Sequence, residues 1–213
     1  KCSLWTNLNF DVSVYEIWSA LLSGAALFIP DGRVRSDAGK FIQWLRKMNI
    51  TGAYIPPFMI ADLAENQLKN PISFKRILTG VEPIPEALLC TIKRNTPGLC
   101  LINGYGPAEA TVCATLYDVP DNPDNPGNAP IGKAVNNLKV YILDESKKPV
   151  KDGKKGEIYI AGIQVADGYL KEKSLSVKNF LENPFLDDLP GLMYKTGDLG
   201  TRLKNGNIMF GGR

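Results

Sequence analysis

Apolar and polar residues along the first half of the chain alternate in a pattern that predicts strands joined by helices. The predicted strands are Ala25–Ile29, Gly52–Ile55, Arg76–Thr79 and Leu99–Asn103. The predicted helices run from Asp11 or Ser13 to a stop at Gly24, from Ser36 or Asp37 through Phe41, Trp44, Leu45 and Met48, and over Phe58–Leu68 and Glu86–Arg94, with Pro85 at the first helical position. This order predicts an α/β fold, a mixed sheet with helical crossovers.

The second half has a different pattern. The segment PDNPDNPGNAP is too rich in Pro, Asn, Asp and Gly for a helix or a central strand, so residues 119–130 are expected to be a linker loop between 1–118 and 131–213. Strands are expected at Leu138–Leu143 and Glu157–Ala161, a short helix at Ser174–Leu181, and a hairpin over Leu203–Phe210 around Asn205-Gly206. The second half is therefore predicted to be a smaller, β-rich subdomain.

Composition excludes several functional classes. The chain has no histidine among its 213 residues, which excludes hydrolysis through a Ser-His or Cys-His pair, and its four cysteines form no C-x-x-C pair for a zinc site. The net charge is +3, and the one lysine cluster, at residues 147–155, carries turn residues and no aromatic side chains. No apolar run is long enough to cross a membrane. We expect a cytoplasmic protein that binds neither nucleic acid nor membrane.

The stretch Asn103-Gly104-Tyr105-Gly106-Pro107-Ala108-Glu109 is the most informative for chemistry. Two glycines allow a ligand to lie against the backbone, Tyr105 offers a flat face for a base, and Glu109 is a hard oxygen ligand suited to Mg²⁺. Taken alone, the stretch is equally consistent with a strand-to-loop turn that packs a tyrosine.

A second stretch, Tyr194-Lys195-Thr196-Gly197-Asp198-Leu199, places a carboxylate after a glycine at the end of a predicted strand. Asp198 could accept hydrogen bonds from two ribose hydroxyls, although a Gly-Asp turn can also bond to its own backbone. A third stretch, GEIYIAG followed by VADGYL over residues 156–170, is expected to be structural, with glycines at bends and no chemistry.

The order and spacing of these stretches, with Asn9-Phe10-Asp11-Val12-Ser13 upstream, resembles one family. FDVSVYEIWSALLSGAAL, NGYGPAEAT, GEIYIAGIQVADGYL and YKTGDLG are similar to four successive core motifs of the adenylation domains of nonribosomal peptide synthetases, in the adenylate-forming superfamily, and GNIMFGGR is similar to the start of the next motif. The resemblance extends over essentially all of the chain.

The resemblance implies an enzyme that joins an amino acid carboxylate to the α-phosphate of ATP, releases pyrophosphate, and loads the aminoacyl group onto the phosphopantetheine thiol of a carrier protein. ATP and Mg²⁺ are the implied cofactors, and the other domains of a synthetase for secondary metabolites are the implied partners. By position in the motifs, Glu109 would bind Mg²⁺, Tyr105 would stack on adenine beside Asn103 and Gly104, Asp198 would hold the ribose, and Arg213 would reach the nucleotide.

In amino-acid-activating members the aspartate of the FDxS motif pairs with the substrate α-ammonium, and here it is Asp11. Asp11 could instead only cap its helix. The other substrate-pocket positions implied by the resemblance are Val12, Tyr15, Phe58, Leu78, Gly80, Gly104, Val112 and Cys113. None of them is charged, so we expect an apolar amino acid such as leucine, isoleucine or valine.

The sequence also departs from the family. Neither the phosphate loop expected upstream of FDxS nor the C-terminal subdomain with its lysine has a counterpart here, so we expect an internal fragment that is inactive alone. Ala108 stands where the family usually has a threonine that reaches phosphate, Val81 replaces a frequent glycine, and Asp167 replaces a frequent arginine. Met209 and Phe210 fall where glutamate and tyrosine are common. These departures keep two alternatives open: a non-catalytic pseudo-adenylation scaffold within a synthetase, and an acyl- or aryl-acid ligase of the same superfamily.

Overall fold

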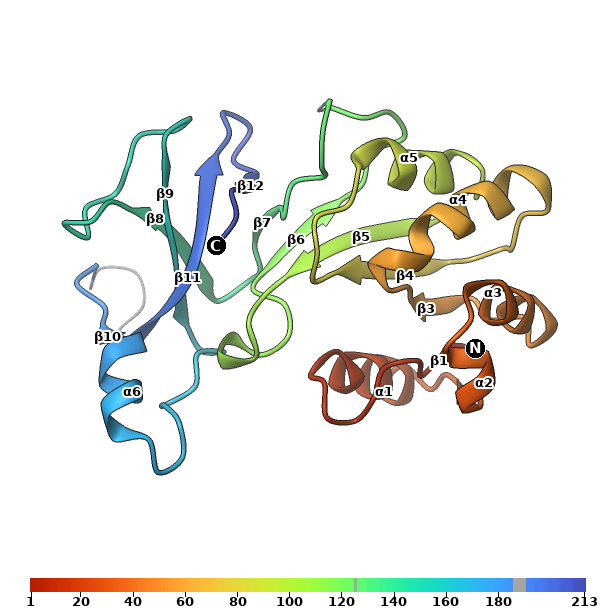
Figure 1. The fold of residues 1–213 in the computed structure, drawn as a ribbon, viewed down its shortest axis with the longest axis horizontal. Coiled ribbons are helices and arrows are strands. Elements are labelled where there is room, and N and C mark those ends of the chain that lie inside the picture. The colour runs from red at the N-terminus through yellow and green to blue at the C-terminus, as the bar shows by residue number, and fades with distance from the viewer. Residues whose placement is uncertain (125, 186–190) are drawn as a thin grey trace. The chain divides into compact units, whose positions relative to one another are not determined.

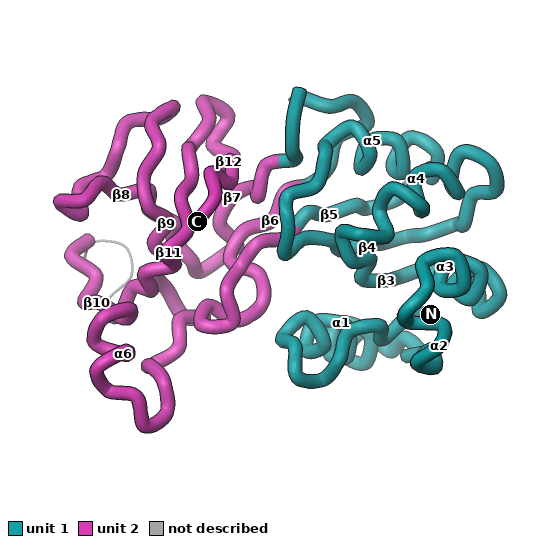
Figure 2. The backbone as a smooth tube through the Cα atoms, in the orientation of Figure 1, with its two compact units in different colours: residues 1–103, 118–129 teal, residues 104–117, 130–213 magenta. Residues whose placement is uncertain are grey.

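The computed structural model describes residues 1–124, 126–185 and 191–213. It forms two compact units, which Figure 2 shows in different colours. Unit 1 contains residues 1–103 and 118–129, and unit 2 contains residues 104–117 and 130–213. The predicted 119–130 loop carries no helix or strand among its described residues, and its residue Asn125 lies outside them.

Unit 1 is built of parallel strands joined by helices (Figure 1). Its elements are β1 Cys2–Ser3, α1 Val12–Leu22, β2 Leu27–Phe28, α2 Gly32–Arg35, α3 Ala38–Lys47, β3 Gly52–Tyr54, the 3-10 turn η1 Pro57–Met59, α4 Ile60–Lys69, β4 Arg76–Gly80, α5 Glu86–Arg94 and most of β5 Cys100–Tyr105. The strand order is β2-β1-β3-β4-β5, and β1 pairs in parallel with β2 and β3, as β3 does with β4. The predicted α/β class is confirmed.

Local sequence explains where these helices begin. At α3 the Asp37 carboxylate accepts a hydrogen bond from the Lys40 amide at 2.8 Å, the expected cap, and Phe41 and Leu45 are fully buried one turn apart. Helix α5 has the predicted bounds, but Pro85 lies at its N-cap, one residue before the predicted position. Two short elements, β1 and α2, were not predicted, because two to four residues are too few to carry a periodic pattern.

Unit 2 is mainly antiparallel β, as predicted. Its elements are η2 Ala108–Ala110, β6 Thr115–Asp118 except its last residue, β7 Lys133–Ala134, β8 Leu138–Leu143, β9 Lys155–Gly162, α6 Lys173–Asn179, β10 Phe180–Glu182, β11 Leu192–Arg202 and β12 Ile208–Phe210. Strands β10, β11, β9 and β8 lie in that order, and β12 pairs with β11. The predicted hairpin around Asn205-Gly206 therefore joins β11 to β12, with its first strand ending at Arg202.

Strand β9 buries side chains on both faces. Ile158 and Ile160 belong to one apolar cluster, while Tyr159 and Ala161 belong to another that includes Met193 of β11. Since successive residues of a strand point to opposite faces, both faces of β9 are covered, and each buried isoleucine contributes about 1.5–3 kcal/mol. This doubly covered strand lies next to β11 and pairs with it.

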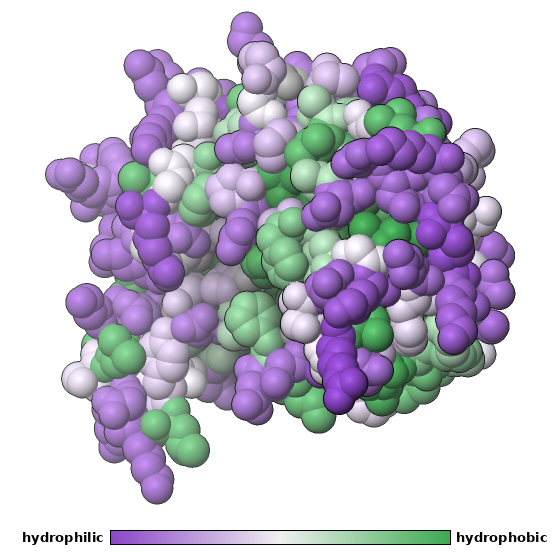
Figure 3. Space-filling model, turned by 45° about the vertical axis from the view of Figure 1, so that its right-hand side comes forward, coloured by the Kyte–Doolittle hydropathy of each residue, from purple (hydrophilic) through white to green (hydrophobic). Residues whose placement is uncertain are grey.

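Apolar residues also appear in patches on the hydrophilic surface (Figure 3). On α1, the side chains of Val14, Trp18 and Leu22 are exposed. Within the described ranges, no helix combines the length and apolar character needed to cross a membrane.

Candidate functional site

Tyr105, Asp198 and Arg213 form one polar group in unit 2, joined by a hydrogen bond and an ion pair. The Tyr105 hydroxyl donates to Asp198 Oδ2 at 2.8 Å, and Arg213 Nε lies 3.4 Å from Asp198 Oδ1. The Arg213 side chain is 78% exposed, so its ion pair contributes at most about 1 kcal/mol to stability. Three residues that the sequence nominated separately for nucleotide binding thus lie together.

Asp198 lies at a break in the pairing register of β11. The pairing of β11 with β9 shifts between Lys195 and Leu199, and Gly197 has a φ of 74°, which glycine adopts without strain. Asp198 was predicted at a strand end. That prediction was wrong, because β11 continues to Arg202 and a bulge within the strand turns the residue out of the ladder.

The backbone around Asp198 is held by other groups. The Asp198 amide donates to Thr196 Oγ1 at 3.0 Å, and the Gly197 amide donates to Glu157 Oε1 at 3.2 Å. Neither bond uses the Asp198 carboxylate, which instead accepts from Tyr105. A purely local Gly-Asp turn therefore does not account for this side chain.

The Tyr105 ring is partly buried. It packs against the cluster that contains Ile158 and Ile160, and its centroid lies 6.2 Å from that of Phe210 at an angle of 44°. Burial, together with the hydrogen bond to Asp198, raises the pKa of the Tyr105 hydroxyl far above its usual value. Tyr105 consequently stays protonated and acts as a donor to Asp198.

Glu109 lies in a second polar group with two tyrosines. Tyr169 donates to Glu109 Oε1 at 2.5 Å, and the Tyr169 and Tyr194 hydroxyls are 3.3 Å apart. Burial opposes ionisation of Glu109, but the hydrogen bonds it accepts, chiefly from Tyr169, hold its pKa below the usual value. The carboxylate is therefore ionised at neutral pH.

This contact involves two tyrosines that the sequence analysis did not single out. The stretch containing Tyr169 was expected to be structural, and its hydroxyl bonds to the candidate metal ligand. Tyr194 lies in a motif whose candidate residue was Asp198, and it was not itself nominated. The sequence offered little signal for either tyrosine, because a hydrogen bond across 60 residues leaves no periodic trace.

The donor set around Glu109 fits Mg²⁺ in a limited way. Mg²⁺ commonly takes one or two carboxylates and completes its shell with water and substrate phosphates. Among the described residues, no three His, Cys, Asp or Glu side chains lie close enough to hold a metal ion. Glu109 could therefore be one carboxylate ligand of Mg²⁺ only if water or phosphate oxygens supply the other ligands.

The remaining candidates in unit 2 lie near the end of β5. Gly104 is buried within the strand, while Val112 and Cys113, both partly buried, follow η2 in a tight turn. Asn103, the last residue of unit 1 before this point, is 4% exposed. The nucleotide candidates Asn103, Gly104 and Tyr105 are therefore consecutive residues of strand β5.

The amino-acid candidates of unit 1 come from three elements. Asp11 precedes α1, which carries Val12 and Tyr15, whereas Phe58 lies on η1 and Leu78 and Gly80 lie on β4. The Asp11 side chain makes no capping hydrogen bond to the first turn of α1, which weakens the alternative that it serves only as a cap.

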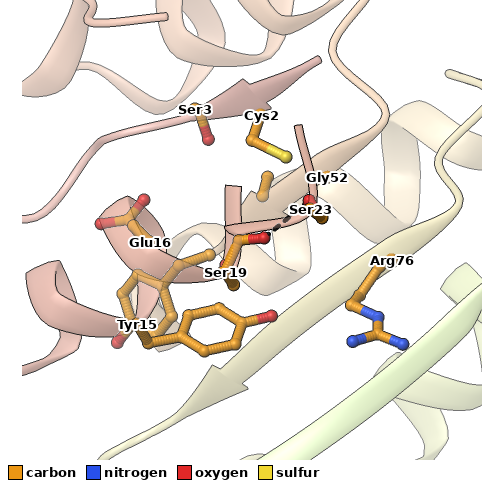
Figure 4. A pocket seen from close by; sticks show the side chains of 10 residues that line it. Cys2, Ser3, Tyr15, Glu16, Ser19, Ser23, Gly52 and Arg76 are labelled. Atoms are coloured by element: carbon orange, nitrogen blue, oxygen red, sulfur yellow. Dashed lines mark hydrogen bonds between the residues drawn. The ribbon is translucent and has the colours of Figure 1, made fainter. Parts of the chain in front are cut away.

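Two of these candidates, Tyr15 and Phe58, line different cavities of unit 1. Tyr15 lines a cavity of about 280 Å³ with Cys2, Ser3, Glu16, Ser19 and Arg76, which Figure 4 shows from close by. Phe58 lines another of about 440 Å³, with Trp5 and Tyr54 among its aromatic walls. Glu16 accepts from the amides of Trp5 and Thr6, each at 2.8 Å, and burial raises its pKa.

The residues that depart from the family lie in different surroundings. Ala108 and Asp167 are exposed, and Met209 and Phe210 are partly buried on β12. Val81 has a φ of 72°, a left-handed conformation that a β-branched residue rarely adopts. A glycine would occupy that conformation without strain.

Comparison with known proteins supplies the family. The model of the AMP-binding enzyme family matches residues 2–170. The chain is 37% identical over 213 residues to one of the plipastatin synthase proteins of Bacillus subtilis (strain 168) and 34% identical over 214 residues to tyrocidine synthase 1 of Brevibacillus parabrevis. These alignments cover 98% and 100% of the chain but only 8% and 19% of the relatives, so it corresponds to a small part of each.

Solved structures agree in fold. PA1221, described as a nonribosomal peptide synthetase protein containing adenylation and PCP domains, superimposes with a TM-score of 0.86 at 26% identity, covering 100% of this chain and 43% of that one. The N-terminal subdomain of Klebsiella oxytoca NpsA, in complex with 3-hydroxybenzoyl-AMSN, gives 0.84 at 24% identity and covers 54% of that chain. At 24% identity, the similarity to NpsA is evidence for the fold only.

Proposed function

This chain belongs to the AMP-binding enzyme family, and on that premise we propose that it is the middle part of an amino-acid-activating adenylation domain of a nonribosomal peptide synthetase. The whole protein would join an amino acid to AMP with consumption of ATP and release pyrophosphate. It would then transfer the aminoacyl group to the phosphopantetheine thiol of a carrier protein. We assign it to the cytoplasm.

The observation that carries the proposal is the group formed by Tyr105, Asp198 and Arg213. A nucleoside needs a flat surface for its base and acceptors for its ribose hydroxyls. The Tyr105 ring supplies the surface, with Asn103 and Gly104 at the adenine edge, and the Asp198 carboxylate accepts from the ribose. Arg213, a largely exposed cation next to Asp198, reaches the nucleotide.

Glu109 supplies the negative charge that a divalent cation requires. When bound, Mg²⁺ would neutralise phosphate charge and so favour attack at the α-phosphate. The chain's own contribution is to keep the Glu109 carboxylate ionised and oriented through Tyr169. Nucleotidyl transfer depends more on charge and positioning than on acid–base groups, which suits a chain without histidine.

Asp11 would pair with the α-ammonium of the amino acid. Leaving such a carboxylate unpaired costs on the order of 3–5 kcal/mol, which disfavours hydroxy and keto acids more than about 100-fold. The side-chain pocket would be lined by Val12, Tyr15, Phe58, Leu78, Gly80, Gly104, Val112 and Cys113. Because these positions carry no charge, we propose an apolar substrate such as leucine, isoleucine or valine.

A second candidate function is a non-catalytic scaffold. Ala108 favours it, because this exposed position has no hydroxyl to offer a phosphate where the family commonly has threonine. A scaffold would keep the fold without turnover.

The test is amino-acid-dependent ATP–pyrophosphate exchange with pooled and then single amino acids, using the parent protein and residues 1–213 alone. We expect exchange only in the parent protein and only with apolar amino acids. Asp11→Ala should abolish it, with Asp152→Ala in an exposed turn as the control. No exchange in the parent protein would favour the scaffold, and unchanged exchange in Asp11→Ala would refute the role of Asp11.

A further inference from the structure

The turn that follows Glu109 is strained in an unusual way. Thr111 and Val112 are consecutive β-branched residues with φ values of 57° and 66°, in the left-handed region that favours glycine. The Cys113 amide donates to the Thr111 carbonyl at 2.9 Å, so Val112 is the centre of a three-residue turn with positive φ, the rare and strained form. Such strain persists only where surrounding contacts enforce it, and it is concentrated at functional sites.

Contacts inside the loop enforce part of this geometry. The Ala114 amide donates to the Tyr105 carbonyl at 2.8 Å, which closes residues 105–114 into a compact loop. Gly106 permits the closure, because a Cβ there would lie 2.6 Å from both the Ala114 nitrogen and the Val112 oxygen. The loop therefore has little freedom at its base.

Contacts to the segment 164–169 hold the tip of the loop. The Thr111 hydroxyl donates to the Gln164 carbonyl at 2.8 Å, and the Ala166 amide donates to the Glu109 carbonyl at 2.9 Å. Tyr169 adds its bond to the Glu109 carboxylate. Three hydrogen bonds thus fasten this part of the loop to one neighbouring segment of unit 2, two of them through Glu109 and one through Thr111 of the strained turn.

The same turn carries residues of two proposed sites. Glu109 precedes Thr111 by two residues and is the proposed metal ligand, while Val112 and Cys113 follow it directly and are proposed to line the amino-acid pocket. Any rotation of the Thr111 backbone out of the left-handed region would move both sides of the turn. Within the turn 111–113 only Thr111 carries a hydroxyl group. Its hydrogen bond to the Gln164 carbonyl opposes that rotation.

We propose that Thr111 is a positioning residue which, through its hydroxyl bond to Gln164, holds Glu109 and the Val112–Cys113 pair in their working arrangement. The proposal rests on the proposed function of those residues. It assigns Thr111 no contact with substrate: Thr111 acts through the backbone of the turn. The segment 164–169, for which the sequence suggested no chemistry, becomes the support of the site.

The test compares Thr111→Val, which removes the hydroxyl and keeps the branched shape, with Thr111→Ser, which keeps the hydroxyl. Thr91→Val is the matched control, because Thr91 donates an equivalent bond to the Ala87 carbonyl at 2.9 Å on helix α5 of unit 1. Hydrogen exchange in the parent protein is followed by mass spectrometry in peptides covering 105–114 and 162–170. Turnover is followed by ATP–pyrophosphate exchange.

We expect Thr111→Val to accelerate hydrogen exchange in both peptides and to lower kcat/KM for the amino acid by about threefold to tenfold, as for loss of one hydrogen bond. Discrimination between leucine and valine should weaken as well. Thr111→Ser and Thr91→Val should resemble the wild type in both assays, and thermal stability should be similar in all four proteins.

Other outcomes overturn the proposal. If hydrogen exchange is unchanged in Thr111→Val, the hydroxyl does not hold the loop. If hydrogen exchange becomes faster while kcat/KM for the amino acid stays unchanged, the loop does not position the site. Equal losses in Thr111→Ser and Thr111→Val would also refute it. If the wild-type parent activates no amino acid, the proposed function fails, and the hydrogen-exchange comparison still decides whether Thr111 fastens the loop.

Discussion

The Tyr105 hydroxyl donates to the Asp198 carboxylate at 2.8 Å, although the two residues are 93 positions apart in the sequence. The bond joins the end of β5 to the bulge in β11. It orients the carboxylate proposed to hold the ribose by means of the ring proposed to hold the base. A single contact therefore links the two halves of the proposed nucleoside site.

Tyr105→Phe should raise the KM for ATP by about threefold to tenfold and leave kcat within about twofold, because the aromatic face remains and only the bond to Asp198 is lost. The measurement is ATP–pyrophosphate exchange at varied ATP with saturating amino acid. Tyr159→Phe is the control, since Tyr159 bonds to Glu157 at 3.2 Å. An unchanged KM in Tyr105→Phe would remove the orienting role of this hydroxyl.

Tyr169→Phe should increase the Mg²⁺ concentration required for half-maximal exchange and lower kcat/KM by on the order of tenfold. The reason is that Glu109 loses a charge-assisted hydrogen bond that fixes its carboxylate. Tyr141→Phe is a suitable control, because the buried Tyr141 hydroxyl has no hydrogen-bond partner in the described part of the chain. Equal Mg²⁺ dependence in the two variants would contradict the prediction.

Glu16 should make stability depend on pH in a predictable direction. Burial raises its pKa above 4.5 in the folded protein, so the folded state binds the proton more tightly than the unfolded state. The stabilisation from this group is fully present below the unfolded pKa and is lost as pH rises through the folded pKa. The difference in unfolding free energy between wild type and Glu16→Gln should therefore increase as pH falls through that window.

Urea unfolding of both proteins at several pH values measures this difference. Subtracting the unfolding free energy of Glu16→Gln from that of the wild type at each pH removes the contributions of the other carboxylates. A difference that stayed constant, or that decreased on acidification, would contradict a raised pKa for Glu16.

Val81→Gly should raise the free energy of unfolding by about 0.5–1 kcal/mol. The left-handed conformation of Val81 costs about 1–2 kcal/mol, which exceeds the entropic cost of about 0.5–1 kcal/mol for glycine. The Val81 side chain is 54% exposed, so little packing is lost. Val177→Gly, in helix α6, should destabilise by contrast. Thermal and urea unfolding test both, and a destabilised Val81→Gly would argue against strain at this position.

Much of the fold followed from local patterns. Helix α3 begins after a capping aspartate and buries Phe41 and Leu45 with helical spacing, and β8 has the predicted bounds Leu138–Leu143. These features depend on neighbours within a few positions, which is why periodicity finds them. The very short β1 and α2, and the continuation of β11 through Asp198, depend on pairing with other segments and were not predicted correctly.

The sequence by itself determined the family resemblance, the order of most helices and strands, and the candidate residues Asp11, Glu109 and Asp198, because these are properties of residue types at fixed spacing. Only the tertiary structure decided which candidates touch. It placed Asp198 on Tyr105 and Tyr169 on Glu109, and it held Thr111 and Val112 in left-handed conformations. Such contacts arise where distant segments pack together, and the energy that compensates for backbone strain comes from those contacts rather than from the local sequence.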